Sequence, residues 1–574
     1  MLRRLVHAGK EGNPMRSIRL LLMLAMVGVV GAGVLIKETD ADTQVAVALT
    51  GQVTSAEEGP MEGVLVSAKK TGSTITTTVF TDEKGRYQFP ASRLGPGDYT
   101  IRIRATGYDL EGPTAVEIPA NDPVSLDLKL RKTKDLAAQL TNAEWLVSFP
   151  GTAEQKASIQ NCSHCHTLEP IVRSHHDAAE FEKVLERMSH YTPESFPLMP
   201  QPHMPSRTGG GELNTEQQAQ AQQNRRKMAE YLATLNLSAA PQWSYTLQHF
   251  PRAKGLGNKA IITEYDLPKA TRQPHDVVVD SDGMVWYAGF GEPILGKMDP
   301  KTGKVTEYPL PVLKPHTVVG NLDVEFDEDQ NLWIAMTFQG AIAKFDRKTE
   351  KLNVFKLPPE LDGDYREITF VAPQHSHVDG KVWLTDAGSY TQLRLDIASG
   401  KWETFEAFPV PRPNIYQVIS DPQNNLYLDV MGRQDIGKID AKTGKITFYP
   451  TPTAHSAPRR GMLDAQGRLW FGENRSNKIG MFDTKTQKFQ EWDSPTPEFF
   501  PYDVAADKSG EAWAIGEFAD SVLRLNPKNG QFAEYPMPRF TNMRRAFVDN
   551  STKPVTFWVG NTHGASIAKL EPLN

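Results

Sequence analysis

Hydrophobic and polar positions alternate in two parts of the chain and follow a helical period between them. Residues 49–131 are short alternating segments separated by turns, which is typical of β-strands. Residues 132–240 carry apolar side chains at helical spacing, and short alternating segments return from residue 260 to 574. The pattern predicts a multidomain, mainly β protein with a small all-α domain in the middle and a linker over residues 241–259.

Four helices are predicted in the middle domain. Asn142–Phe149 and Ala153–Gln160 precede a cysteine-containing motif, and a third helix follows Asp177, an expected N-cap, as far as Met188. Thr215, with Gln218 three positions later, offers a capping box for a last helix that ends at Leu235.

The chain from residue 260 repeats a strand that follows an acidic turn and ends in an aromatic residue. These aromatic markers, spaced 43 to 50 residues apart, are Trp286, Trp333, Trp383, Tyr427, Trp470, Trp513 and Trp558. Each copy has room for four short strands, which predicts a seven-bladed β-propeller. The seventh copy lacks its last strand, and a matching segment, Ile262–Pro268, precedes the first copy. We therefore expect an N-terminal strand to close the ring.

The starts of the inner strands should line the central opening of such a propeller. The residues eleven positions before the markers are His275, Leu322, Ala372, Tyr416, Arg459 and Tyr502, with Arg544 and Arg545 near the last equivalent. Guanidinium groups pair with carboxylate or phosphate, so Tyr416, Arg459, Tyr502, Arg544 and Arg545 predict a site for a small anionic or polar substrate. The alternative is that these side chains satisfy one another. His316, His375 and His377 lie close to this opening in sequence and could hold a divalent metal.

The chain has two cysteines, and both belong to the motif Cys162-Ser163-His164-Cys165-His166. C-x-x-C-H is the attachment sequence of haem c, in which Cys162 and Cys165 bind the haem covalently and His166 is the proximal iron ligand. A thioredoxin-like thiol pair would need a βαβ context, which this segment lacks. The motif predicts one covalent haem c.

A sixth iron ligand is expected from the loop before the last helix. Met204 is predicted as the distal ligand, with Met199 as the alternative, because each precedes a proline in that loop. Ligation by a second histidine stays open, from His190, His203 or the pair His175-His176. Met188 and Met228 are predicted to be core residues.

The first 40 residues read as an export signal or an N-terminal membrane anchor. Basic residues precede an apolar run over residues 20–36, and charged residues follow it. Either interpretation predicts a periplasmic or other extracytoplasmic location, with membrane attachment through residues 20–36 in the second. The net charge of −6 and the pI near 6.2 give no support for nucleic acid as a partner.

Two parts of the chain resemble known non-propeller families. Gly85-Arg86-Tyr87-Gln88-Phe89, the segment Leu94–Tyr99 and Gly107-Tyr108 resemble the carboxypeptidase regulatory-like domain, which implies a non-catalytic, transthyretin-like β-sandwich over residues 49–131. Helices, C-x-x-C-H and a closing helix that ends in Y-L-A-x-L resemble a single-haem class I cytochrome c over residues 132–240.

The propeller resembles the virginiamycin B lyase family, which opens streptogramins, in the segment Leu469–Gly480 and its repeats. The resemblance implies a catalytic histidine after a proline, a Glu-Pro-His one blade further on, and magnesium near the substrate. Pro274-His275 matches the first element. At the second, lysine replaces glutamate in Lys314-Pro315-His316, and His316 is out of register with His275. His275 and His316 are therefore weak candidates for a catalytic pair.

These features together predict an exported c-type cytochrome that carries out haem-mediated electron transfer. Its redox partner is unknown, and we expect the transfer to be coupled to a substrate or partner bound at the propeller opening. Two alternatives remain: a virginiamycin B lyase-like enzyme that cleaves a C–O bond, and a non-catalytic propeller binding protein with an accessory haem.

Overall fold

The computed structural model describes residues 46–192, 195–202, 214–362, 367–387, 391–405 and 414–573. Contacts divide the chain into Met1–Val45 and Ala46–Asn574. The first unit contains the predicted export signal or anchor and lies outside the described residues. Among the residues that are described, no helix combines the length and apolar character needed to cross a membrane.

The N-terminal domain consists of two β-sheets that enclose an apolar core. Its strands are β1 (Val47–Ser55), β2 (Gly59–Pro60), β3 (Leu65–Lys70), β4 (Ile75–Phe80), β5 (Arg86–Pro90), β6 (Gly97–Arg104), β7 (Tyr108–Glu111), β8 (Ala115–Ile118), β9 (Val124–Ser125) and β10 (Leu128–Lys132). One sheet has the order β2-β1-β10-β7, with β5 and β9 also paired to β1; the other contains β4-β3-β6-β8. Tyr87 and Phe89 alternate with exposed neighbours on β5 and are buried between the sheets. The predicted sandwich is confirmed.

Helices occupy the middle of the chain, as the periodicity predicts. They are η1 (Leu136–Gln139), α1 (Asn142–Ser148), α2 (Ala153–Ser158), η2 (Gln160–His164), α3 (Glu169–Val172), α4 (Ala178–Met188), α5 (Thr215–Leu235) and η3 (Leu237–Ala239). Asp177 caps α4 as expected, since its side chain accepts from the Glu180 backbone N–H. The predicted cap of α5 is wrong by one residue: Asn214, paired with Gln217, forms the capping box, and Thr215 is already helical.

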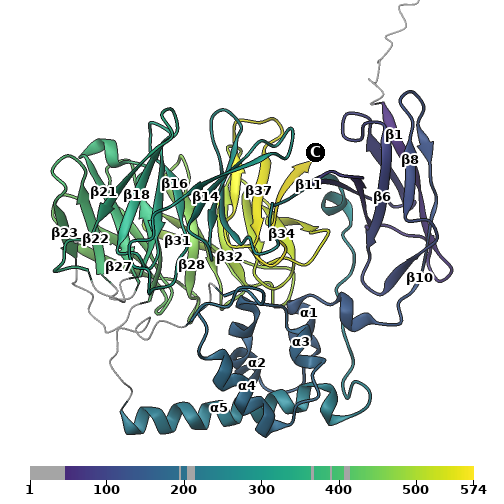
Figure 1. The fold of residues 1–574 in the computed structure, drawn as a ribbon, viewed down its shortest axis with the longest axis horizontal. Coiled ribbons are helices and arrows are strands. Elements are labelled where there is room, and N and C mark those ends of the chain that lie inside the picture. Colours follow the sequence, from purple (N-terminus) through teal and green to yellow (C-terminus); the bar gives the residue numbers. More distant parts are fainter. Residues whose placement is uncertain are drawn as a thin grey trace, which may run out of the picture. The chain divides into compact units, whose positions relative to one another are not determined.

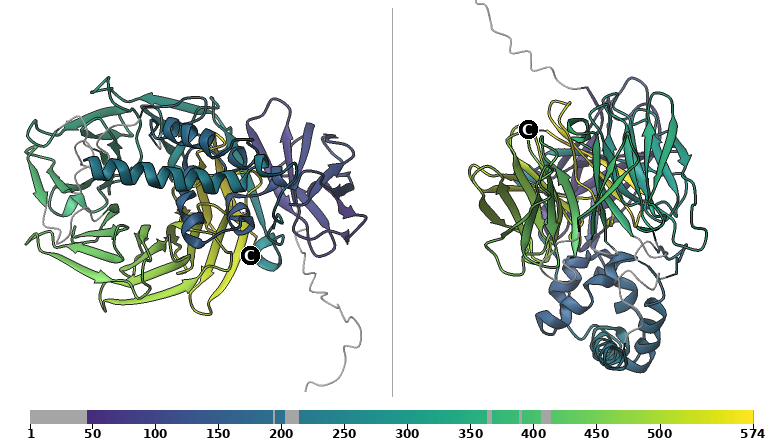
Figure 2. Two further views of the ribbon diagram at one scale, coloured as in Figure 1. Left: turned by 90° about the horizontal axis from the view of Figure 1, so that it is seen from below. Right: turned by 90° about the vertical axis from the view of Figure 1, so that its left-hand side faces the viewer.

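Six four-stranded sheets follow one another around a ring, and a seventh blade closes it (Figures 1 and 2). The first sheet consists of β12 (Pro274–Val279), β13 (Val285–Gly289), β14 (Ile294–Met298) and β15 (Val305–Pro309). The second consists of β16 (Val324–Phe326), β17 (Leu332–Met336), β18 (Ala341–Asp346) and β19 (Lys351–Lys356). The third consists of β20 (Ile368–Ala372), β21 (Lys381–Asp386), β22 (Thr391–Asp396) and β23 (Trp402–Phe405). The next three are β24 (Ile415–Ser420), β25 (Leu426–Val430), β26 (Asp435–Ile439) and β27 (Ile446–Pro450); β28 (Pro458–Leu463), β29 (Arg468–Glu473), β30 (Lys478–Asp483) and β31 (Lys488–Asp493); and β32 (Pro501–Ala506), β33 (Ala512–Gly516), β34 (Ser521–Asn526) and β35 (Gln531–Pro536). We number these sheets as blades 1 to 6.

Blade 7 is completed by a strand from the beginning of the propeller. It contains β36 (Phe547–Asp549), β37 (Thr556–Asn561) and β38 (Ser566–Pro572), and its outer strand is β11 (Ala260–Asp266), which pairs with β38. The predicted closure is confirmed. The other edge of β11 pairs with β4 of the sandwich, so one sheet of eight strands runs from blade 7 into the N-terminal domain. This pairing covers the edge that β11 would otherwise expose.

Two local contacts explain the repeat in several blades. In blades 1, 2, 5 and 6 the marker tryptophan donates its indole N–H to the aspartate of the acidic turn, as in Trp286 to Asp280 at 2.7 Å and Trp513 to Asp507 at 3.0 Å. The glycine of the third strand makes room for an aromatic ring on the second: a Cβ at Gly296 would lie 2.0 Å from the Tyr287 ring. Blades 1 and 5 contain the aspartate, the tryptophan and the glycine together, whereas the indole of Trp383 in blade 3 donates to the Asn424 carbonyl and that of Trp558 in blade 7 donates to Thr556.

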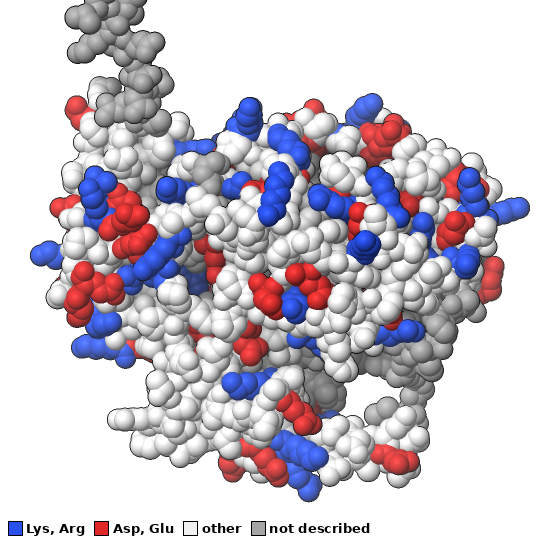
Figure 3. Space-filling view, turned by 180° about the vertical axis from the view of Figure 1, so that it is seen from behind, with Lys and Arg blue, Asp and Glu red and all other residues white. Residues whose placement is uncertain are grey.

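The helical segment shares an apolar core with the propeller. Trp145 of α1 belongs to the same buried cluster as Phe499, Phe500 and Phe518 of blade 6, and the Ala143 N–H donates to the Phe518 carbonyl at 2.9 Å. The predicted linker also lies on this core, since Trp243 packs against Trp145 with ring centroids 5.5 Å apart and the ring planes tilted by 57°. On the surface drawn in Figure 3, basic and acidic side chains are interspersed.

Candidate functional site

Strand pairing fixes which residues stand at equivalent places around the central opening. The inner strand of every blade begins at the same end of the ring, and we call this end the mouth. In blades 1, 2, 4, 5 and 6 the marker pairs with the residue eight positions earlier, for example Trp286 with Val278, and the mouth residue lies three positions before that partner. This register confirms that the predicted mouth residues of these blades occupy equivalent positions; they are His275, Leu322, Tyr416, Arg459 and Tyr502.

In two blades the mouth residue does not lie eleven positions before the marker, because the hairpin between the first and second strands is longer. In blade 3, Trp383 pairs with Ala372 itself, so Thr369 takes the mouth position and the prediction of Ala372 is wrong. In blade 7, Trp558 pairs with Phe547, which places Arg544 in the ring. Arg545 therefore belongs to a second, deeper layer.

The upper layer of the mouth is a stack of aromatic and guanidinium groups. The hydroxyls of Tyr416 and Tyr502 contact each other, and the Arg459 guanidinium lies 3.9 Å from the centroid of the Tyr502 ring. Arg459 also pairs with Glu517 at 2.7 Å. Burial alone would raise the pKa of Glu517, but Arg459 and His164 hold that pKa well below its usual range, so Glu517 is a carboxylate.

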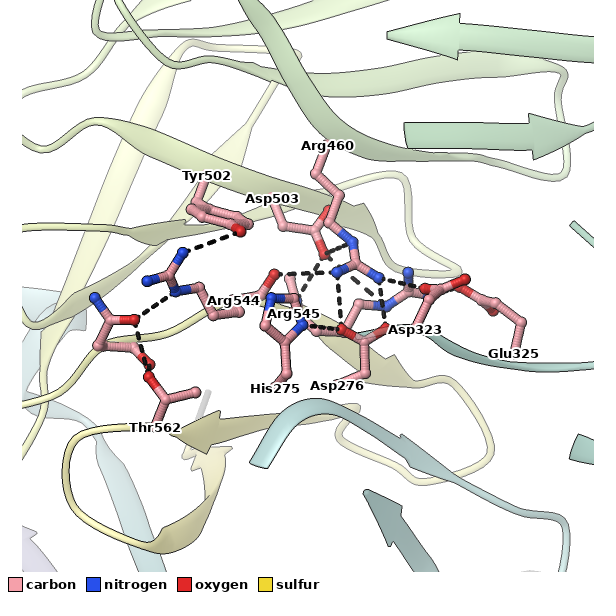
Figure 4. A network of polar contacts seen from close by, with 12 residues as sticks. His275, Asp276, Asp323, Glu325, Arg460, Tyr502, Asp503, Arg544, Arg545 and Thr562 are labelled. Carbon is pink, nitrogen blue, oxygen red and sulfur yellow. Dashed lines mark hydrogen bonds and ion pairs between the residues drawn. The ribbon is translucent and has the colours of Figure 1, made fainter. Parts of the chain in front are cut away.

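The deeper layer is a buried network of ion pairs (Figure 4). Arg460 binds both carboxylate oxygens of Asp276, at 2.8 and 2.5 Å, and one of Asp323 at 2.9 Å. Arg545 pairs with Glu325 at 2.5 Å. The oxygens of Asp276, Asp323 and Glu325 lie close enough together to bind a cation. Arg460 and Arg545 already supply positive charge at this cluster, which favours a structural role for it.

His275 stands where the two layers meet. It is fully buried, its Nδ1 lies 2.8 Å from Asp276, and its ring packs on Phe290 with centroids 4.7 Å apart. Burial lowers the pKa of His275 to about 4, which leaves a neutral imidazole at pH 7. His316 is exposed in the connection between β15 and β16, so the two predicted catalytic histidines lie in different environments.

The histidines predicted as a metal cluster are not gathered at the mouth. His375 and His377 lie in the hairpin between β20 and β21, at the far end of the inner strand. His375 Nδ1 lies 3.0 Å from the Ser420 carbonyl oxygen, and His377 pairs with Glu328 at 2.9 Å. The expectation that these two residues lie near the mouth is therefore wrong.

The loop of the C-x-x-C-H motif lies on the mouth. The Ser163 carbonyl accepts from Asn542 Nδ2 at 3.4 Å, and the His164 carbonyl accepts from His563 Nε2 at 3.2 Å. His164 Nε2 lies 3.6 Å from Glu517. The structure thus joins two sites that the sequence predicted separately. Asn542, His563 and Glu517 were missed because the interaction spans about 380 residues of sequence and none of the three stands at an inner-strand start.

Both cysteines open onto a largely apolar cavity of about 910 Å³ within the helical segment. Its lining includes Cys162, Cys165 and His166, and the apolar side chains Ile171, Phe181, Val184, Leu185, Phe196 and Leu232. Burial raises the pKa of the Cys162 thiol to about 11, which disfavours the thiolate that thiol–disulfide exchange requires. The surroundings therefore suit covalent attachment of an apolar group better than a reactive thiol pair.

His166 is oriented by its neighbour in the chain. Its Nδ1 lies 2.6 Å from the Thr167 carbonyl oxygen, which is a hydrogen bond only if Nδ1 carries the proton and donates it. The other ring nitrogen, Nε2, is then the unprotonated one that a metal would bind. The donor set and the cavity lining both fit a haem held by this motif.

The predicted distal ligand, Met204, lies outside the described residues, as does His203. The alternative, Met199, closes a turn in which its backbone pairs with Phe196. Met188 and Met228, predicted as core residues, line the cavity, and Met188 is 39% exposed. The interpretation of Met188 as core is wrong, because α4 presents this residue to the cavity.

Comparisons with known proteins match both β domains. The model of the carboxypeptidase regulatory-like domain matches residues 48–131, and that of the virginiamycin B lyase family matches residues 320–573. These matches confirm the predicted N-terminal domain and the lyase-like propeller. A search of curated proteins found no match.

Solved structures similar to the chain include two lyases. A streptogramin B lyase is 23% identical, covers 55% of this chain and 99% of its own, and has a TM-score of 0.48. A catalytically inactive virginiamycin B lyase from Staphylococcus aureus with quinupristin is 23% identical, covers 54% of this chain and 98% of its own, and has a TM-score of 0.46.

Proposed function

We propose that this chain is a c-type electron-transfer protein in which a haem is attached at Cys162 and Cys165, next to a ligand-binding propeller mouth. The observation that carries the proposal is the geometry around the motif: both cysteines and an oriented His166 line an apolar cavity, and the loop between the cysteines lies on the mouth. Bound there, haem c supplies reversible one-electron chemistry between ferric and ferrous iron.

The residues of the chain have distinct roles in this proposal. Cys162 and Cys165 form the thioether bonds, and His166 offers Nε2 because Nδ1 donates to the Thr167 carbonyl. The largely apolar lining would give a haem a surrounding of low polarity, which is one way in which a protein tunes a haem potential. Asn542 and His563 hold the loop against the mouth, so a molecule bound at the mouth lies beside the attachment site.

Export is part of the same proposal. Covalent haem attachment in bacteria takes place outside the cytoplasm, and the basic and apolar pattern of residues 1–40 suits either a cleaved signal or a retained anchor. We therefore propose a periplasmic protein, attached to the membrane through residues 20–36 if that segment is retained.

The test is expression with export and a c-type haem maturation system. We expect haem that stays with the denatured polypeptide and a c-type α-band on reduction. Cys165→Ala should abolish stable two-thioether attachment, whereas Lys183→Ala, a change in an exposed residue of α4 that does not line the cavity, should leave the spectrum unchanged. An identical haem spectrum from Cys165→Ala would contradict the proposal. Met204→Ala and Met199→Ala should show which methionine, if either, gives the Met-ligand absorption band.

A second candidate function is lyase chemistry, which the family match over residues 320–573 favours. His275 follows Pro274 at an inner-strand start, as the resemblance requires. Elimination would need this imidazole as a general base in contact with substrate, whereas its Nδ1 faces Asp276 and its ring is fully buried. Turnover of quinupristin by the wild-type protein, lost in His275→Ala and independent of haem, would establish this function in place of electron transfer.

A further inference from the structure

Arg544 is a buried cation at the mouth that lacks a carboxylate partner. Its side chain is 4% exposed, and among the described residues no acidic group forms an ion pair with it. Its contacts are neutral: Nε donates to Asn542 Oδ1, one terminal nitrogen lies 3.4 Å from the Tyr502 hydroxyl and the other 3.5 Å from the His164 carbonyl oxygen. A guanidinium has five N–H donors, so two remain unused, and two of these three contacts are long.

The neighbouring acidic groups are already engaged. Glu517 attracts Arg544 electrostatically without forming an ion pair with it, and its carboxylate is already paired with Arg459 at 2.7 Å. Asp276 and Asp323 bind Arg460, and Glu325 binds Arg545, in the deeper layer of Figure 4. Every other arginine at the mouth thus has its own carboxylate. A buried charge without a counter-ion is unfavourable, which makes Arg544 a place where an anion would be stabilised.

The surroundings of Arg544 define the anion. One unpaired guanidinium matches a single negative charge, and its planar fork matches the two oxygens of a carboxylate. The Tyr502 ring, 5.3 Å from the guanidinium carbon, and the partly exposed Tyr416 add aromatic surface beside it. These features favour a monocarboxylate with a flat or apolar body.

We propose that Arg544 anchors a carboxylate at the propeller mouth, beside the loop of the C-x-x-C-H motif. This inference rests on the proposed function for its biological meaning, because it places the ligand next to the haem attachment site. The carboxylate has two sources that share one chemistry: a free organic acid that exchanges at the mouth, or a carboxylate side chain of the attached haem itself.

The test uses the full-length chain after haem maturation, with sodium benzoate as probe and benzamide as its neutral analogue. If the site takes a free acid, calorimetric titration of this mature protein should detect binding of benzoate and none of benzamide. Arg544→Gln should weaken benzoate binding at least tenfold, and Arg544→Lys, which keeps the charge but not the fork, should weaken it less. Arg475→Gln changes an exposed arginine beyond β29 and should leave binding unchanged. Melting curves of each variant show whether it is folded.

A second set of measurements separates the two sources. The variant Cys162→Ser/Cys165→Ser has no covalent haem. If a haem carboxylate occupies the site, benzoate should bind this variant but not the mature protein, and Arg544→Gln should shift the haem reduction potential. If the ligand is a free acid, benzoate should bind both forms, and the potential should not move. Absence of Arg544-dependent benzoate binding in both forms, with an unchanged potential, overturns the inference.

Failure of the carboxylate site at Arg544 can be distinguished from failure of the proposed electron-transfer function. If maturation attaches no haem, the proposed function fails, while benzoate titration of the haem-free chain and of its Arg544→Gln variant still decides whether Arg544 binds a carboxylate. Binding that Arg544→Gln abolishes would then support the site alone.

Discussion

Arg460 shows how much one side chain contributes when it is buried among acids. It is fully buried and contacts Asp276 at 2.5 Å and Asp323 at 2.9 Å, with Asp503 at 3.6 Å. These three aspartates come from the inner strands of blades 1 and 6 and the connection before β16, so a single guanidinium links distant parts of the ring. Taking ions out of water is costly, and only their mutual pairing offsets that cost.

Arg460→Leu should therefore destabilise the protein strongly. Removing one partner of a buried ion pair typically costs about 3–5 kcal/mol, since the remaining carboxylates lose their counter-ion. Lys478→Leu is the control, because Lys478 pairs at 2.6 Å with Asp493, whose side chain is exposed, and exposed pairs contribute less than about 1 kcal/mol. The measurement is the free energy of unfolding in denaturant. Equal losses for the two variants would mean that the network is not what holds the inner strands together.

At the scale of a blade, the same glutamate position has a basic neighbour in one copy of the repeat and an acidic neighbour in another. Glu307 on β15 is the strand-pairing partner of Gly296 in the third strand of blade 1. Glu491 on β31 is in the same way the partner of Gly480 in blade 5. In blade 1 the partner is Arg272, which binds both oxygens of Glu307 at 2.6 Å. In blade 5 the neighbour is another acid, Glu473 of β29. Burial and the adjacent Glu491 raise the pKa of Glu473 to about 8.

This difference predicts a pH dependence with a definite sign. The pKa of Glu473 is higher in the folded than in the unfolded chain, so its favourable contribution is complete below about pH 4.5 and is lost as the pH rises through about 8. Glu473→Gln should remove this loss and raise stability relative to wild type at pH 8–9. Glu307→Gln should do the opposite at neutral pH, because the pKa of Glu307 is lowered, chiefly by its hydrogen bond with Arg272. Urea unfolding between pH 4 and 9 measures both. If the stability of Glu473→Gln depends on pH in the same way as that of the wild type, the raised pKa of Glu473 is contradicted.

At the scale of the whole described unit, the sandwich and blade 7 are joined through backbone hydrogen bonds. β11 pairs over seven residues with β38 and over five with β4, so β4 is an interior strand of an eight-stranded sheet. A strand in that position has no free edge, and its amides are protected from water on both sides. The closing blade and the N-terminal domain should therefore open together.

Hydrogen exchange tests this coupling. Amides of Ile75–Phe80 should exchange as slowly as those of Ala260–Asp266, and both should be slower than those of the outer strand Val305–Pro309, which ends the sheet of blade 1. The comparison is made at one pH and temperature by mass spectrometry of peptides. Fast exchange in β4, at the rate of β15, would show that the two domains separate in solution.

The sequence by itself determined the elements and their repeats, because these depend on local chemistry. Periodicity, the acidic turn with its tryptophan and the missing last strand predicted the sandwich, the helices, the seven blades and the closing strand. The register of His275, Tyr416, Arg459 and Tyr502 was also predictable, since hairpins of constant length keep the spacing constant. The spacing failed at Ala372, where three extra hairpin residues move Thr369 into the ring.

Only the tertiary structure decided which surfaces meet. No spacing rule links His164 to Glu517 or Ser163 to Asn542, because these contacts form between domains that are hundreds of residues apart. The same holds for β4 on β11 and for Arg544, whose lack of a carboxylate partner depends on the pairing of every neighbouring acid. Local patterns report the preferences of adjacent residues, whereas the balance of buried charges depends on the whole packed molecule.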